Sequence, residues 1–146
     1  MSHDLWRVEE IDEVDSTNSY LAVRAREGAE EGLVIRTEYQ SVGRGRLDRV
    51  WEAPKGTALL VSFLFRPEKE VAPQLVVAAV ALAARSALQK VTGFSIDLKW
   101  PNDLLVGDKK LAGILAEYIS EPSSAVIVGL GLNLTESPGE GSTNLK

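Results

Sequence analysis

The 146-residue sequence contains no cysteine and a single histidine, and these two absences remove several classes of site. Without cysteine the chain has no disulfide, no thiolate metal ligand and no cysteine nucleophile. His3 stands near the start, where residues are usually loosely attached to a fold. We therefore expect neither a Ser/His/Asp triad nor a metal site, and any chemistry must rest on other side chains.

An excess of positive charge and long apolar runs are also missing. The 21 acidic residues outnumber the 16 basic ones, so the net charge of −5 leaves no broad basic face for general nucleic-acid binding. The longest apolar run, 75–84, is shorter than the roughly 20 residues that span a bilayer. The first ten residues lack the pattern of a secretory signal. We expect a cytoplasmic protein that binds neither DNA nor a membrane.

The order of the expected elements predicts one domain, 1–146, of the α/β or α+β class, with a mixed β-sheet flanked by helices. One helix follows the cap residues at 15–18, and a second lies at 74–91 between Pro73 and Gly93. The second helix is apolar nearly all round in its first half, so we expect it to be buried. Apolar and alternating runs predict strands at 5–14, 32–39, 58–65, 94–100, 104–106, 110–119 and 125–134.

The stretch QSVGRGRLDRVW, residues 40–51, concentrates three arginines in an otherwise acidic chain. Gly43 and Gly45 allow positive φ and a close approach of backbone to ligand, and guanidinium groups suit phosphate or carboxylate. Trp51 could stack on a ring or cover a ligand. No Gly-Lys-Ser/Thr follows, so this is not a P-loop. The stretch is either a mobile anion-binding loop or a solvated surface loop.

Three further segments carry groups of the kind that bind polar ligands. Residues 15–18, Asp-Ser-Thr-Asn, supply more cap groups than one helix start needs. Lys99 ends a strand just before a proline, which presents its ammonium rigidly. Glycines interrupt apolar strands at 110–115 and 129–133, as happens where a ligand or another backbone comes close. The alternatives are a redundant cap, a strand end with an exposed lysine, and a weakened strand.

In combination these segments resemble the catalytic domain of biotin protein ligases. The matching motifs are DSTNSYL at 15–21, EYQSVGRGRLDRVW at 38–51, KWPNDLLVGDKKLAGILAE at 99–117 and VGLGLNL at 128–134. The resemblance implies the mixed-sheet fold of biotin ligases and class II aminoacyl-tRNA synthetases. It also implies formation of biotinyl-5'-AMP from biotin and MgATP, followed by biotin transfer to a lysine of a biotin carboxyl carrier protein, such as an acetyl-CoA carboxylase subunit. The alternatives are a lipoate-type ligase and a truncated, non-catalytic protein that binds biotin or its adenylate.

The resemblance also implies roles for individual residues. Lys99 would bridge the biotin carboxylate and the ATP α-phosphate, and Arg44 and Arg46, the other catalytic residues, would lie on a loop that closes over both ligands. The implied biotin-binding residues are Ser16, Thr17, Asn18, Gln40, Gly43, Arg44, Gly45, Arg46, Lys99 and Gly113. The residues implied for ATP or the adenylate are Arg46, Trp51, Lys99, Asn102 and Asn133. Magnesium would enter with ATP as substrate, and no metal ligand is assigned.

The sequence departs from the family pattern at three points. Asp48 stands where family members often have glycine. No winged-helix region precedes the first strand, so we do not expect the DNA-binding repressor role of some relatives. The usual C-terminal region after Lys146 is also missing, so the resemblance is to the catalytic domain alone. It is compatible with a homodimer formed through sheet edges.

Overall fold

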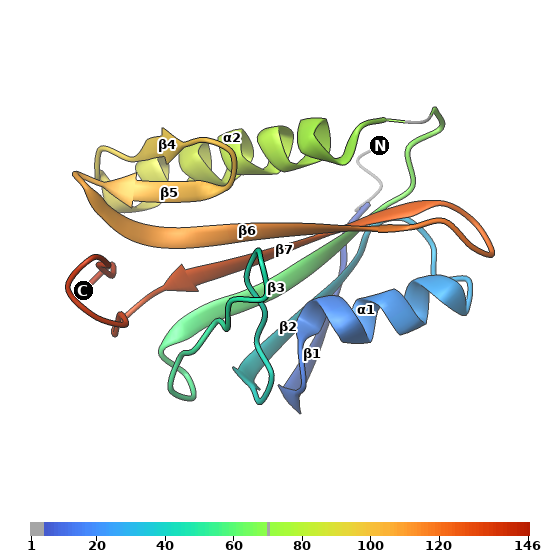
Figure 1. Ribbon diagram of the computed structural model, residues 1–146, viewed down its shortest axis with the longest axis horizontal. Coiled ribbons are helices and arrows are strands. Elements are labelled where there is room, and N and C mark those ends of the chain that lie inside the picture. The colour runs from blue at the N-terminus through green and yellow to red at the C-terminus, as the bar shows by residue number, and fades with distance from the viewer. Residues whose placement is uncertain (1–4, 70) are drawn as a thin grey trace.

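A computed structural model describes residues 5–69 and 71–146, and His3 lies outside them. These residues form a seven-stranded sheet in the order β1-β2-β3-β7-β6-β5-β4, with a helix on each face (Figure 1). β1 and β2 are parallel, and all other neighbouring pairs are antiparallel. The elements are β1 (Arg7–Val14), α1 (Thr17–Arg26), β2 (Leu33–Gln40), β3 (Ala58–Phe65), α2 (Pro73–Thr92), β4 (Asp97–Lys99), β5 (Asp103–Val106), β6 (Lys109–Ile119) and β7 (Ala125–Asn133). The predicted mixed sheet is confirmed, although β4 is shorter than the predicted 94–100.

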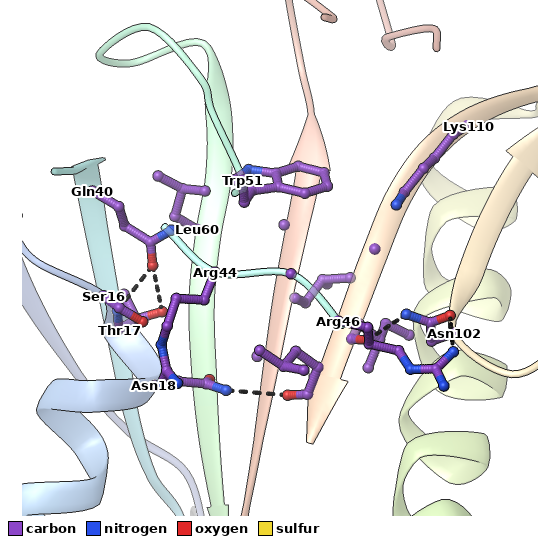
Figure 2. A pocket seen from close by; sticks show the side chains of 17 residues that line it. Ser16, Thr17, Asn18, Gln40, Arg44, Arg46, Trp51, Leu60, Asn102 and Lys110 are labelled. Atoms are coloured by element: carbon purple, nitrogen blue, oxygen red, sulfur yellow. Dashed lines mark hydrogen bonds between the residues drawn. The ribbon is translucent and has the colours of Figure 1, made fainter. Parts of the chain in front are cut away.

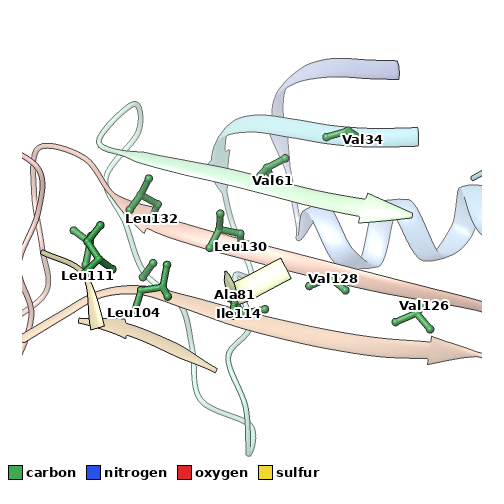
Figure 3. Packing of buried hydrophobic residues seen from close by; sticks show 12 residues of the cluster. Val34, Val61, Ala81, Leu104, Leu111, Ile114, Val126, Val128, Leu130 and Leu132 are labelled. Carbon is green, nitrogen blue, oxygen red and sulfur yellow. The ribbon is translucent and has the colours of Figure 1, made fainter. Parts of the chain in front are cut away.

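Alternation along the strands divides the core into two apolar layers, one on each face of the sheet. The layer between α1 and the sheet consists of Leu21, Ala22, Ala25, Leu33, Ile35, Leu64, Ile119, Ala125 and Ile127. On the face towards α2 lie Val34, Val61, Ala81, Ile96, Leu104, Leu111, Ala112, Ile114, Val126, Val128, Leu130 and Leu132 (Figure 3). Even-numbered residues of β7 thus face α2, and odd-numbered ones face α1. Gly129 and Gly131 therefore lie on the α1 face.

Helix α1 begins as the sequence predicts. Ser16 is the N-cap, and its hydroxyl accepts a hydrogen bond from the backbone N–H of Ser19 at 3.4 Å. On the exposed side, Arg24 donates to Glu9 of β1 at 2.6 Å. This hydrogen bond is the main cause that lowers the pKa of Glu9. Because the folded-state pKa is lowered, the contact stabilises the fold at neutral pH and is lost as the pH falls through that pKa.

The prediction that α2 is buried is wrong. The helix starts at Pro73 and ends at Gly93, which has a left-handed φ of 73°, as predicted. It packs one side on β4 to β7, but Ala81 is its only buried residue, and Leu75 and Leu82 are exposed. By length and composition α2 is the one described helix that could cross a membrane. That is weak evidence, because a helix packed on a globular core can pass the same test.

Arg66 joins the end of α1 to the β6–β7 turn, and its removal should weaken the fold. Its guanidinium donates to Ala25 O at 2.8 Å, to Ala29 O at 2.9 Å and to Ser123 Oγ at 2.8 Å. Arg66→Ala should lower the free energy of unfolding by about 2 kcal/mol, because helix-end carbonyls lose charged donors. Urea unfolding measures this change.

A suitable control is Arg7→Ala, because Arg7 makes only an exposed ion pair with Glu30 at 4.0 Å. That change should stay within about 0.5 kcal/mol. Equal losses in the two variants would contradict the role of Arg66.

Candidate functional site

A pocket opens on the α1 face of the sheet, between the start of α1, the loop 41–52 and strands β6 and β7 (Figure 2). Its volume is about 60 Å³, well below the roughly 300–1,000 Å³ of a typical small-molecule site. A ligand therefore requires the covering loop to move. The lining residues are Ser16, Thr17, Asn18, Gln40, Arg44, Gly45, Arg46, Trp51, Leu60, Asn102, Lys110, Gly113, Ile114, Leu115, Gly129, Leu130 and Gly131.

Polar groups at the start of α1 form one wall of this pocket. Gln40 Oε1 accepts from the backbone N–H of Thr17 at 2.9 Å and from its hydroxyl at 3.1 Å, which orients the Gln40 amide. Asn18 Nδ2 donates to Leu115 O of β6 at 3.2 Å, which ties the start of α1 to the sheet. Ser62 of β3 is fully buried behind both, 2.7 Å from Thr17 Oγ1 and 2.5 Å from Asn18 Oδ1. The wall is therefore held rigidly on strands and a helix.

The glycines of β6 and β7 form recesses that two side chains enter. Gly113 and Gly131 lie directly opposite each other in the β6–β7 ladder. A Cβ at Gly131 would lie 2.5 Å from Cε2 of Trp51, and one at Gly113 would lie 3.2 Å from Cζ3 of the same ring. At Gly129 a Cβ would lie 2.4 Å from Asn18 Oδ1. The close approach predicted for these glycines is made by the protein's own side chains.

The Gly/Arg stretch is a small hairpin. The backbone N–H of Trp51 donates to Gly43 O at 2.9 Å, and that of Gly45 donates to Arg49 O at 2.7 Å. A Cβ at Gly43 would lie 2.2 Å from Trp51 O, so the glycine is required there for close packing. The sequence allowed positive φ at Gly43 and Gly45. In the structure the positive φ angles of the hairpin lie at its tip instead.

The tip of the hairpin explains one departure from the family pattern. Leu47 and Asp48 have φ angles of 55° and 58°. This left-handed region favours glycine, and aspartate is among the residues that tolerate it best. Asp48, where the resemblance led us to expect glycine, therefore occupies a position whose backbone conformation favours a tolerant residue.

Arg44 and Arg46 of the hairpin point to opposite walls of the pocket (Figure 2). Arg44 Nη2 donates to Glu117 Oε2 at 2.8 Å and to Ser19 Oγ at 3.1 Å. Arg46 Nη1 donates to Asn102 Oδ1 at 3.4 Å. Asn102 is itself fixed, because its Nδ2 donates to Ile114 O at 3.0 Å. The hairpin is thus tied over the pocket from both sides.

The structure does not bring Lys99 to the pocket, and it brings Lys110 there instead. Lys99 is exposed on β4, the edge strand, two strands away from β6. Lys110 lines the pocket, with Nζ 5.6 Å from the centroid of the Trp51 ring and 3.2 Å from Asp103 Oδ1. The predicted role of Lys99 therefore lacks support from its position.

A β-bulge aims Lys110 at the pocket. Leu104 pairs with Ala112, but Leu105 pairs with Lys110, which leaves Leu111 as the extra residue. Leu111 enters the buried layer beneath α2. Strict alternation from Ala112 would have placed the Lys110 side chain on that buried face. Simple periodicity therefore gives no signal for Lys110.

Most of the other predicted site residues lie together. Gly43 is at the base of the hairpin and lines a second cavity of about 510 Å³ on the far side of Trp51. Asn133 is buried outside the pocket, and its Nδ2 donates to Thr143 O at 3.0 Å. Predicted residues that line the pocket are Ser16, Thr17, Asn18, Gln40, Arg44, Gly45, Arg46, Trp51, Asn102 and Gly113. No sequence pattern indicated a role for Ser62, Lys110 or Glu117.

Most of this chain is similar in sequence to known protein ligases. Residues 11–133 match the family model described as the biotin/lipoate A/B protein ligase family. The bifunctional ligase/repressor BirA of Bacillus subtilis is 34% identical over 139 residues, which cover 92% of this chain and 42% of that protein. The biotin–[acetyl-CoA-carboxylase] ligase of Mycobacterium tuberculosis is 37% identical over 143 residues, which cover 92% of this chain and 52% of that one.

A solved structure of a biotin protein ligase has a similar fold. The structure of biotin protein ligase from Aquifex aeolicus in complex with biotin and ATP matches with a TM-score of 0.82 at 32% identity. The match covers 95% of this chain and 59% of that chain. The chain thus spans about half the length of the proteins that it matches.

The packing of Trp51 against Gly131 leads to a testable prediction. In Gly131→Ala the new methyl group would collide with the indole ring, so Trp51 should leave its recess. Its Nε1 is buried without a partner, so displacement into water should shift the tryptophan emission to longer wavelength. Fluorescence spectroscopy measures this shift. Gly141→Ala is the control, since a Cβ there meets no atom within 4 Å; identical spectra for the two variants would contradict the proposed packing.

Proposed function

The chain belongs to the biotin/lipoate A/B protein ligase family, and we propose that it is a biotin ligase. In the proposed reaction it forms biotinyl-5'-AMP from biotin and MgATP, and then transfers biotin to a lysine of a carboxyl carrier domain. The reaction would take place in the cytoplasm, where ATP is available. The catalytic groups would be those that line the pocket beneath the hairpin.

The order of groups along the pocket is the observation that carries this proposal. Ser16, Thr17 and Gln40 supply polar groups at one end, while Arg46 and Lys110 supply cations at the other (Figure 2). Between them lies the Trp51 ring in the recesses at Gly113 and Gly131 (Figure 2), and the lining also includes Leu60 and Leu115. Biotin has the same order, because a polar ureido ring is joined by an aliphatic chain to a carboxylate. Hydrogen bonds would fix the ring and cations would receive the carboxylate.

The first step needs two anions in contact. A carboxylate oxygen of biotin attacks the α-phosphorus of ATP, the bond from that phosphorus to the bridging oxygen breaks, and pyrophosphate leaves. Lys110 and Arg46 would offset the repulsion between carboxylate and phosphate, and they would stabilise the charge on the phosphoryl oxygens in the transition state. This assigns to Lys110 the bridging role that the resemblance implied for Lys99.

Trp51 separates the pocket from the 510 Å³ cavity on its other side, since it lines both. An indole ring in this position suits the base of an adenylate, because aromatic faces stack readily on purines. The biotinyl part would then lie in the small pocket beneath the hairpin. Closure of the hairpin would keep water from the mixed anhydride.

In the second step the neutral amine of the acceptor lysine attacks the activated carbonyl carbon, and the bond from that carbon to the phosphate oxygen breaks. AMP leaves with the electrons of that bond, and the nitrogen gives up one proton to water. Among the described residues no group of three or more His, Cys, Asp or Glu side chains is suited to hold a metal ion. Magnesium would enter with ATP as part of the substrate, as the resemblance implies.

The function is tested by incubating the chain with biotin, magnesium and ATP labelled in the α-phosphate. Labelled biotinyl adenylate and an equal amount of pyrophosphate should form, and a carrier domain should then gain biotin on one lysine. Adenylate from lipoate but not from biotin would favour a lipoate-type ligase. Biotin binding without release of pyrophosphate would identify a non-catalytic binding protein.

A pair of lysine variants tests the assignment of the bridging cation. Lys110→Ala should slow adenylate formation by roughly 100- to 1,000-fold, as expected when one charged donor to a transition state is removed. Lys99→Ala, on the exposed edge strand, should stay within roughly two-fold of the parent. Pyrophosphate release under saturating substrate measures both rates. The reverse order of effects would return the role to Lys99.

A further inference from the structure

We propose that Glu117 is a positioning residue that latches the hairpin 43–51 over the pocket through Arg44. The part of this inference that concerns adenylate retention rests on the proposed function. The latch itself is a property of the ligand-free chain, and it can be tested without any substrate.

The geometry of the contact is that of a latch between separate elements. Arg44 is on the first arm of the hairpin, where it pairs with Val50 of the second arm. Its guanidinium reaches out of the hairpin to Glu117 of β6 and Ser19 of α1. Glu117 cannot move with the hairpin, because its backbone pairs with Ile127 inside the β6–β7 ladder. The contact therefore joins a loop to the rigid sheet.

Glu117 lies on the same face of the sheet as the pocket. It follows Gly113 and Leu115 on the α1 side of β6, so the strand presents it towards the pocket. Its side chain is 28% exposed, and that of Arg44 is 41% exposed. Among the described residues this is the one ion pair within 4.0 Å made by an arginine of the hairpin. Arg46, on the other side, is held by a neutral amide.

The strength of the contact suits a latch that must open in every cycle. A partly exposed ion pair changes a closed-to-open equilibrium by roughly two- to five-fold. It is also weakened by salt, because solvent ions screen charges at this exposure. Glu117 would thus favour the closed hairpin without preventing entry of ligand. It would act on the reaction only through Arg44.

Limited proteolysis measures the latch in the ligand-free chain. Trypsin cleaves after arginine, and the hairpin contains Arg44, Arg46 and Arg49, which are exposed at the surface. Cleavage also needs a mobile backbone, and the contacts of Arg44 and Arg46 with the pocket walls hold the hairpin in place. Glu117→Gln keeps the shape of the side chain and removes its charge. This variant should be cleaved within the hairpin roughly two- to five-fold faster than the parent, because cleavage follows the population of the open form. Raising the salt concentration should speed cleavage of the parent and leave the variant little changed.

Glu9→Gln is the matched control. Glu9 also forms a partly exposed ion pair with an arginine, Arg24, at 2.6 Å, but the pair joins β1 to α1 away from the pocket. The hairpin of the Glu9→Gln variant should be cleaved at the same rate as that of the parent. Equal cleavage of Glu117→Gln and parent, or an equal increase in both variants, would overturn the latch.

Release of preformed biotinyl adenylate provides the second readout. Glu117→Gln should release the adenylate roughly two- to five-fold faster, whereas its rate of formation should change less, because Glu117 touches no reacting group. Unchanged release beside faster cleavage would overturn the retention role. If the parent makes no adenylate at all, the proposed function fails, while the proteolysis result still decides the latch.

Discussion

The absence of a side chain at three strand positions is the constraint on which the site depends. Gly113 and Gly131 lie side by side on β6 and β7, and the Trp51 ring rests where their side chains would be. Gly129, which is two residues from Gly131 on β7, leaves room for Asn18 in the same way. Any larger residue would separate the hairpin and the start of α1 from the sheet. The loss of packing that glycine brings to a strand is thus offset by close contact with a tryptophan and an asparagine.

Two of the cations around the recess are paired with carboxylates. Arg44 has Glu117 as its partner, and Lys110 has Asp103 at 3.2 Å. Each cation is therefore held in position before an anion arrives, which reduces the reorganisation that a reaction would require. Each can also turn to a stronger anion, because neither ion pair is deeply buried. The arrangement explains how a chain with a net charge of −5 maintains a local cluster of cations.

The fold was largely predictable because its elements obey simple rules. Apolar runs defined the strands, and caps such as Ser16 and Gly93 fixed the helix ends. Composition misled only for α2, whose apolar surface exceeds the area that the sheet covers. The motifs also predicted most of the residues that gather at the pocket, but they did not predict that Lys110, and not Lys99, lines it. Lys110 reaches the pocket through a bulge, and a one-residue change of register reverses the face of every side chain before it.

The contacts within the hairpin are separate from those that tie it to the pocket walls. The contacts between its arms, from Gly43 with Trp51 to Gly45 with Arg49, lie within the hairpin. The contacts of Arg44 and Arg46 with the two walls are external, and they lie nearer the tip than the seat of Trp51. The tip can therefore lift while the base stays packed on the glycines. The energy of closure then resides in a few exposed polar contacts, which keeps the barrier to ligand entry low.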